Sequence, residues 1–230
     1  MNNLFSNSVT MGVVLSFLAY EIGVYIKTKT QKNIFNPLLI SIVIVIVVLL
    51  IFDIDYDSYN QSAKYISYLL TPATVSLAIP LYRQLDLLKQ NFISIIIGIL
   101  SGVLTSLVSI LGMSMLFGLA HEEYVTLLPK SITTAIGMGV SEELGGYVTI
   151  TVVVIIITGI LGNMIGAFAC KIFRIKNPIS KGLALGTSSH AIGTTKAMEM
   201  GEIEGAMSSL SIVVAGLLTV VLASVFAMLY

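Results

Sequence analysis

The chain alternates between long apolar runs and short polar stretches. Six runs have the length of membrane spans: Val9–Ile26, Pro37–Phe52, Tyr65–Tyr82, Phe92–Leu119, Tyr147–Ile172 and Met207–Leu229. A helix needs about 20 apolar residues to cross a hydrocarbon core of about 30 Å. The pattern therefore predicts an all-α polytopic integral membrane protein. Pro72 and Pro80 interrupt the third run.

Two polar segments between these runs repeat one pattern, A-I-G-x5-E-x-G. The first copy is Ala135–Gly145 and the second, 56 residues later, is Ala191–Gly201. Upstream hydroxyl residues also match, Ser131 with Thr187 and Thr133 with Ser189. Irregular polar backbone is tolerated in a membrane only where it is buried in protein or lines a cavity. A repeated pair of interrupted segments therefore indicates a transporter's binding site, the alternative being chance reuse of Ala, Ile and Gly.

Positively charged loops mark the cytoplasmic side of a membrane protein. The loop after the first run contains lysines, and the loop after the third run contains Arg83 and Lys89. The loop after the second run contains aspartates, and the loop after the fourth run contains His121 and two glutamates. This alternation predicts an N-terminus outside the cell. The loop Lys171–Lys181 is positive again and should be cytoplasmic, although a single span, Tyr147–Ile172, reaches it from outside.

The stretch Pro129–Gly146 should therefore enter and leave the membrane on the outer side. Its apolar part, Ser131–Val140, would be about 15 Å long as a helix, which is half a bilayer. By the same reasoning Gly182–Gly201 dips in from the cytoplasm. We predict about six full transmembrane helices plus two re-entrant or broken helices in an inverted-topology repeat. The alternative, eight transmembrane helices, would place the Lys171–Lys181 loop outside, against the charge rule.

Composition narrows the class further. Hydrophobic residues make up 56% of the chain and charged residues 10%, against roughly 25% charged in soluble domains. The net charge of zero gives no reason to expect nucleic acid binding, and the single Cys170 excludes an internal disulfide. We expect no catalytic residues, no metal site and no cofactor, with coupling to H⁺ or Na⁺ left open. The chain reads as one membrane domain, residues 1–230, with scaffold spans at 8–62 and a broken-helix transport core at 63–230.

The first repeat offers donors for an anion. A half-helix that starts at Pro129 would present free N–H groups and a positive dipole, and Thr133 and Thr134 would add neutral donors. Lys130 either attracts an anion or extends to the membrane interface. Thr74, in the interrupted third run, could complete the polar lining, although hydroxyls in a kinked helix often bond back to their own backbone.

The second repeat is richer in polar side chains. Its candidates for substrate binding are Thr187, Ser188, Ser189, His190 and Thr194. His190 could donate to a carboxylate or change protonation near neutral pH, the alternative being a neutral packing histidine. Because the two segments enter from opposite faces, we expect Thr133, Thr134, Ser189, His190 and Thr194 to converge near the midplane.

Charged residues close each repeat. Glu143 and Glu199 are expected to cap helices or to pair with Lys130 and Lys196, and proton or sodium coupling is the alternative role. Glu202 and Glu204 are expected to be solvated loop charges. Gly162 and Gly166 form a G-x-x-x-G pattern, which permits close helix packing.

Three stretches resemble the signature segments of the LrgB/CidB family of bacterial membrane proteins: TPATVSLAIPLY, PKSITTAIGMGVSEELGG and KGLALGTSSHAIGTTKAMEMGEIEGAMSSL. The resemblance covers nearly the whole chain. Ala135 stands where the family would have proline, and Lys196 where arginine is common. A lysine keeps the charge but lacks the bidentate fork of arginine.

The resemblance implies a multi-pass protein of the bacterial cytoplasmic membrane with one of two functions. Relatives such as the plastid glycolate/glycerate translocator imply a secondary transporter of small monocarboxylates of the pyruvate, lactate or glycolate type, which would act with a small LrgA/CidA-like membrane partner. The alternative is an antiholin-like regulator of murein hydrolase activity and autolysis without a substrate site. Analogy with moving-domain carriers adds a homodimer to these expectations.

Overall fold

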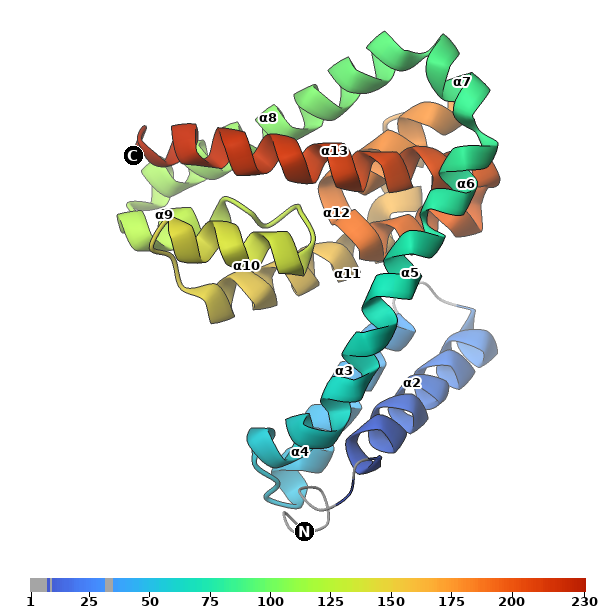
Figure 1. Ribbon diagram of the computed structural model, residues 1–230, viewed down its shortest axis with the longest axis vertical. Coiled ribbons are helices and arrows are strands. Elements are labelled where there is room, and N and C mark those ends of the chain that lie inside the picture. Colours follow the sequence, from blue (N-terminus) through green and yellow to red (C-terminus); the bar gives the residue numbers. More distant parts are fainter. Residues whose placement is uncertain (1–7, 9, 32–34) are drawn as a thin grey trace. The chain divides into compact units, whose positions relative to one another are not determined.

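The computed structural model describes residue 8, residues 10–31 and residues 35–230, without the side chains of residues 70, 71 and 74. Val9, the first residue of the first predicted span, lies outside the described residues. So does Lys32, the last lysine of the positive loop that follows this span. All regular secondary-structure elements of the described residues are helices (Figure 1). The chain divides into two compact units, residues 1–76 and 77–230. The all-α prediction is confirmed, and the assignment of a single domain stays a prediction.

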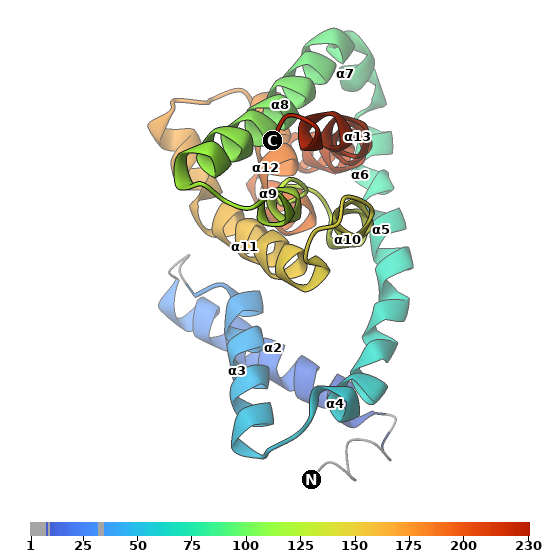
Figure 2. The same ribbon diagram turned by 90° about the vertical axis from the view of Figure 1, so that its left-hand side faces the viewer.

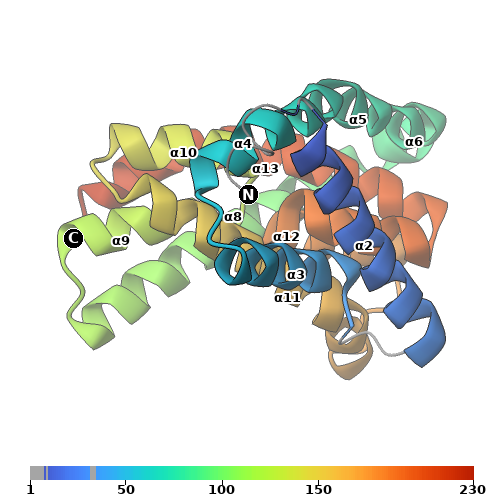
Figure 3. The same cartoon turned by 90° about the horizontal axis from the view of Figure 1, so that it is seen from below.

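The first unit is a pair of helices with a short helical tail. Its elements are α2 (Met11–Thr30), α3 (Pro37–Ile51), α4 (Tyr56–Ala63), the 3₁₀ helix η1 (Lys64–Leu69) and α5 (Leu70–Ser76). Helices α2 and α3 lie side by side (Figure 3). Asn36 caps α3 by accepting from the Leu38 N–H at 2.9 Å. Asp55 caps α4 by accepting from the Ser58 N–H, and this hydrogen bond lowers the pKa of Asp55.

The third apolar run does not form one continuous helix. Residues 65–82 form η1, α5 and then α6 (Ala78–Arg83). Proline is tolerated only in the first turn of a helix because it lacks an N–H, and Pro72 and Pro80 each fall in the first turn of a short helix. The Ser76 hydroxyl donates back to the Pro72 carbonyl at 2.8 Å, as the kinked-helix alternative expects.

The second unit packs its helices around α12. Its remaining elements are α7 (Leu85–Gln90), α8 (Phe92–Phe117), α9 (His121–Leu127), α10 (Thr134–Glu143), α11 (Val148–Ile172), α12 (Pro178–Met200) and α13 (Glu202–Ala227). Helix α12 contacts α8, α11 and α13 (Figure 2). Four described helices, α2, α8, α11 and α13, are long and apolar enough to cross a membrane, and α3 is a shorter apolar helix. These helices fit a polytopic membrane protein, while the number of crossings stays a prediction.

Helix α8 carries two different faces. Ile95, Ile99, Val103 and Leu107 recur at helical spacing and are buried in the apolar core. Beside them, one position earlier, run Gly98, Gly102 and Ser106. The helix ends at Gly118, whose φ of 63° is the left-handed conformation that glycine adopts at helix ends. Helix α8 therefore packs through its isoleucine face and leaves a narrow polar face beside it.

The 56-residue repeat is present in the helix bounds. Moved forward by 56 residues, α10 covers 190–199 and α11 covers 204–228. The part of α12 after its break at His190 covers 191–200, and α13 covers 202–227. The glycine of each A-I-G motif also meets the carbonyl group eight residues before it. A Cβ on Gly137 would lie 3.5 Å from the Pro129 oxygen, and one on Gly193 would lie 2.8 Å from the Leu185 oxygen. The sequence repeat is thus a structural repeat.

The two copies run in opposite directions. The start of α11 joins α9 through the Thr151 hydroxyl, which donates to the Thr126 carbonyl at 2.9 Å. The end of α13 reaches the same helix, because the Tyr124 hydroxyl donates to the Phe226 carbonyl at 2.9 Å. Helices α11 and α13 are therefore antiparallel (Figures 1 and 3), as an inverted repeat requires.

Candidate functional site

The first break lies between α9 and α10. Helix α10 begins at Thr134, with Thr133 as an extended N-cap residue (φ −65°, ψ 145°), so the predicted start at Pro129 is wrong. The β-branched run Ile132-Thr133-Thr134 disfavours helix and threonine favours the N-cap position. Helix α10 has 10 residues, about 15 Å, which matches the predicted half-bilayer length.

The second break lies inside α12. His190 has φ 42° and ψ −137°, which are not helical. The side chain of His190 is buried, and its Nε2 lies 3.0 Å from the Ile155 carbonyl oxygen of α11. Beyond the break, Asn163 of α11 donates to the Ile192 carbonyl at 2.9 Å. Helix α11 thus satisfies polar groups on both sides of the broken backbone.

Residues beside the two breaks contact the middle of α8. Ser131 of the first copy lies against Ser106, with 3.1 Å between their hydroxyl oxygens. Thr187, its match in the second copy, packs on Gly102, where a Cβ would come within 2.9 Å of the threonine oxygen. Gly102 and Ser106 are the eleventh and fifteenth of the 26 residues of α8. The matched hydroxyl residues therefore sit one helical turn apart near the centre of a membrane-length helix.

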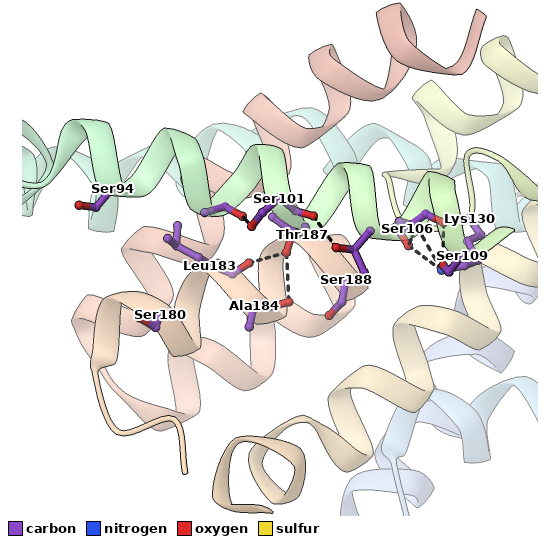
Figure 4. Close-up of a pocket in the computed structure, with 14 residues that line it drawn as sticks. Ser94, Ser101, Ser106, Ser109, Lys130, Ser180, Leu183, Ala184, Thr187 and Ser188 are labelled. Carbon is purple, nitrogen blue, oxygen red and sulfur yellow. Dashed lines mark hydrogen bonds between the residues drawn. The ribbon is translucent and has the colours of Figure 1, made fainter. Parts of the chain in front are cut away.

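A polar cavity of about 550 Å³ lies along the middle of α8 (Figure 4). Its walls come from α8, from the segment before α10 and from α12. Most lining residues carry a hydroxyl group or are small, and none of those described is acidic: Ser94, Gly98, Ser101, Gly102, Thr105, Ser106, Ser109, Lys130, Ser131, Ser180, Leu183, Ala184, Thr187 and Ser188. The volume is in the range of small-molecule sites. The cavity carries a net positive charge from Lys130 alone.

The Lys130 side chain reaches the middle of α8. Its Nζ donates to the Ser131 hydroxyl at 3.0 Å and lies 3.4 Å from the Ser106 hydroxyl. Among the described residues it forms no ion pair, so it does not pair with Glu143, and the capping role expected for Glu143 stays a prediction. Glu143 is the last residue of α10, whereas Lys130 precedes the first residue of that helix.

The structure separates the predicted site residues into two groups. Thr187 and Ser188 line the cavity. Ser189, His190 and Thr194 are buried in helix contacts: a Cβ on Gly162 would collide with Ser189, and Thr194 lies 2.7 Å from Ser208 of α13. The five residues predicted to converge do not line this cavity, and the two segments instead each contact α8 near its middle, through Ser131 and Thr187.

The remaining predicted residues have different positions. Thr133 and Thr134 are half-buried at the start of α10 and are not among the cavity residues. The side chain of Thr74 lies outside the described residues. Whether any of these groups binds a substrate stays a prediction.

Three predictions about charge and packing have clear outcomes. Lys196 pairs with Glu199 at 2.8 Å, as expected. Glu204 is buried, with Lys181 3.8 Å away, so its assignment as a solvated loop charge is wrong. Gly162 and Gly166 provide close packing as predicted, because side chains of α12 occupy the space that a Cβ would need.

Sequence reasoning missed the contribution of α8. The side chains of Ser101, Thr105 and Ser109 are exposed and line the cavity. The signal was present, because Ser, Thr and Gly form two neighbouring rows with a spacing of three or four positions, 94, 98, 102 and 106 in one and 98, 101, 105 and 109 in the other. Within a strongly apolar run this stripe was hidden by the average hydropathy.

Residues 16–229 match the model of the LrgB-like family. The chain belongs to the LrgB-like family. It is 39% identical over 216 residues to proteins named "Antiholin-like protein LrgB" from Bacillus mycoides (strain KBAB4), Bacillus cereus (strain B4264) and Bacillus anthracis (strain CDC 684 / NRRL 3495), with 94% of each chain covered. No solved structure matches the chain. Family membership agrees with the resemblance of the three signature segments.

Proposed function

We propose that this LrgB-like protein is a secondary transporter of small monocarboxylates, of the pyruvate, lactate or glycolate type, in the bacterial cytoplasmic membrane. The observation that carries the proposal is a cavity at the middle of α8 that is lined by hydroxyl residues and Lys130 from segments beside both inverted breaks. Transporters of this architecture place their substrate sites at such midplane breaks.

The chemistry of the cavity fits a small anion. An anion that leaves water loses its hydration and needs charge and donors in return. The cavity offers the ammonium group of Lys130, and no described carboxylate neutralises it. A polar group at membrane depth is a functional candidate by default. A scaffold without a substrate would need only apolar interfaces there.

Uptake by proteoliposomes tests the proposal. The purified protein is reconstituted with and without a small LrgA/CidA-like partner, and uptake of labelled pyruvate, lactate and glycolate is measured under imposed H⁺ or Na⁺ gradients. We expect saturable uptake of at least one acid. Absence of saturable uptake of every C2–C4 acid in both preparations would exclude the carrier.

A second candidate is an antiholin-like regulator of murein hydrolase activity and autolysis. The names of the Bacillus relatives support it more directly than they support any transported substrate. The two candidates differ in one measurable respect. A regulator without a substrate site should control lysis of cells in media with and without C2–C4 acids alike, whereas a carrier should affect lysis only where these acids are produced or supplied.

A further inference from the structure

We propose that Lys130, Ser106 and Ser131 form the subsite for the substrate's carboxylate, and that the rest of the cavity selects 2-hydroxy acids over 2-oxo acids. This inference rests on the proposed transport of small carboxylates and goes beyond it by assigning the binding groups and the selectivity. It also moves the site from the expected Thr134 and His190 to the wall of α8.

The three side chains form a closed set of contacts. Lys130 Nζ lies 3.0 Å from the Ser131 hydroxyl and 3.4 Å from the Ser106 hydroxyl, and the two hydroxyl oxygens are 3.1 Å apart. All three residues line the cavity, and Figure 4 shows Lys130 beside Ser106 at one end of it. The set comes from two elements, α8 and the segment before α10, so it depends on their packing.

Counting hydrogens shows what this set still offers. An ammonium group has three N–H donors, and two are directed to the serine oxygens. The two serines have two hydroxyl hydrogens, of which one can bridge their 3.1 Å contact. One N–H and one O–H therefore remain for a ligand, which matches the two oxygens of a carboxylate. A charge-assisted pair of this kind is about twice as strong as a neutral one.

Four other hydroxyl groups of the cavity already donate to backbone carbonyls of their own helices. Thr187 donates to the Leu183 carbonyl at 2.7 Å. Ser101, Thr105 and Ser109 donate to the carbonyls of Gly98, Ser101 and Ser106 in their own helix, at 2.7–2.8 Å. Their hydrogens are used in these bonds, so they present lone pairs to the cavity.

A second polar group on the substrate should therefore be a donor. The hydroxyl group of lactate or glycolate can donate to Thr187 or to the α8 hydroxyls, whereas the keto oxygen of pyruvate can only accept. A site that bonds a substrate hydroxyl discriminates strongly against a ligand that lacks it, because its polar groups are left without a partner. We expect the affinity of the site to be highest for lactate or glycolate, lower for pyruvate and lowest for propionate.

The experiment compares variants in vesicles of neutral phosphatidylcholine, so that no anionic lipid headgroup competes for Lys130. Lys130→Met, Lys130→Arg and Thr187→Val are compared with wild type and with a matched control, Lys176→Met, which removes an exposed lysine outside the cavity. Uptake gives KM and kcat for lactate, pyruvate and propionate, and calorimetric titration of detergent-solubilised protein with lactate gives affinity independently of transport. Thermal unfolding shows that each variant is folded.

We expect Lys130→Met to weaken binding of all three acids about 10- to 100-fold, Lys130→Arg to restore part of it, and Lys176→Met to behave as wild type. Thr187→Val should raise KM for lactate and leave KM for propionate unchanged. If Lys130→Met does not fold, Ser131→Ala tests the carboxylate subsite, and Thr187→Val still tests the selectivity. Wild-type affinity in Lys130→Met, or equal affinity of wild type for lactate and propionate, would overturn the inference. Binding that depends on Lys130 without uptake would instead reject the transporter and leave the subsite standing.

Discussion

A single backbone conformation sets the second break. Four described residues other than glycine have positive φ, and three of them, Gln31, Asp53 and Arg174, follow the ends of helices. His190 is different because it interrupts a helix from inside. Its φ of 42° is in a region where a side chain costs about 1–3 kcal/mol. The contact of the imidazole with the Ile155 carbonyl and the close fit against Gly159 hold it there.

This conformation predicts an unusual order of stability for two substitutions. His190→Gly and His190→Ala both lose the contact with Ile155, so their difference reports the backbone alone. Inside a regular helix alanine is more stable than glycine by about 1 kcal/mol. At a positive φ the order should reverse, with His190→Gly more stable than His190→Ala by about 1 kcal/mol. Thermal unfolding in detergent measures the difference, and a more stable alanine variant would mean that α12 is not broken at this residue.

The positions of the hydroxyl residues could be predicted from the sequence only in part. The sequence identified the two polar segments because glycine, proline and threonine act locally on the backbone. It could not identify which hydroxyl faces the cavity, because Ser131 and Thr187 owe their position to contacts with Ser106 and Gly102 of a distant helix. The direction of Lys130 depends on the same packing.

At the scale of helices, small residues decide how closely elements approach. Gly193 lies where the second half of α12 folds back on the first: a Cβ there would be 2.6 Å from the Ser189 Cβ and 2.8 Å from the Leu185 carbonyl oxygen. Both neighbours are fixed parts of the helix and cannot rotate away. Gly139, in the corresponding helix α10 of the first copy, has no atom within 4 Å of such a Cβ.

These two glycines give a matched pair of substitutions. Gly193→Ala should destabilise the protein by about 1–3 kcal/mol, since overpacking forces the backbone to shift. Gly139→Ala should leave the stability within about 1 kcal/mol of wild type because the space is open and alanine favours helix. Thermal unfolding and the yield of monodisperse protein check both. Equal effects of the two changes would contradict the close approach at Gly193.

At the scale of the molecule, the repeat and the alternation of charge could be predicted from sequence, because both are linear patterns. The structure adds that the end of α11 and the start of α12 lie at the end of the second unit where Lys181 approaches Glu204. Tyr147, at the opposite end, donates to the Glu122 carboxylate at 2.6 Å. The positive loop and the tyrosine-rich end are thus at opposite ends of α11.

Orientation in the membrane follows from this separation. In a background with Cys170→Ala, Lys176→Cys should be protected from a membrane-impermeant thiol reagent in intact cells and labelled after permeabilisation. Lys176 is preferred to Asn177, which caps α12 through the Ile179 N–H. His121→Cys, at the opposite end, should show the reverse behaviour. Labelling of Lys176→Cys from outside would reject the arrangement with two re-entrant segments.

The two copies share their helix bounds but break in different ways. The first has an extended stretch before Thr134, and the second has one distorted residue, His190. The same motif thus has two different backbone forms at corresponding positions of the two antiparallel copies. In a carrier built from inverted repeats, exchange of these two backbone forms between the copies would be a route to alternating access. Such a cycle would change backbone torsions around residues 130 and 190 and leave every helix folded. The difference between the two copies therefore indicates which torsions would change in the second conformation of the cycle.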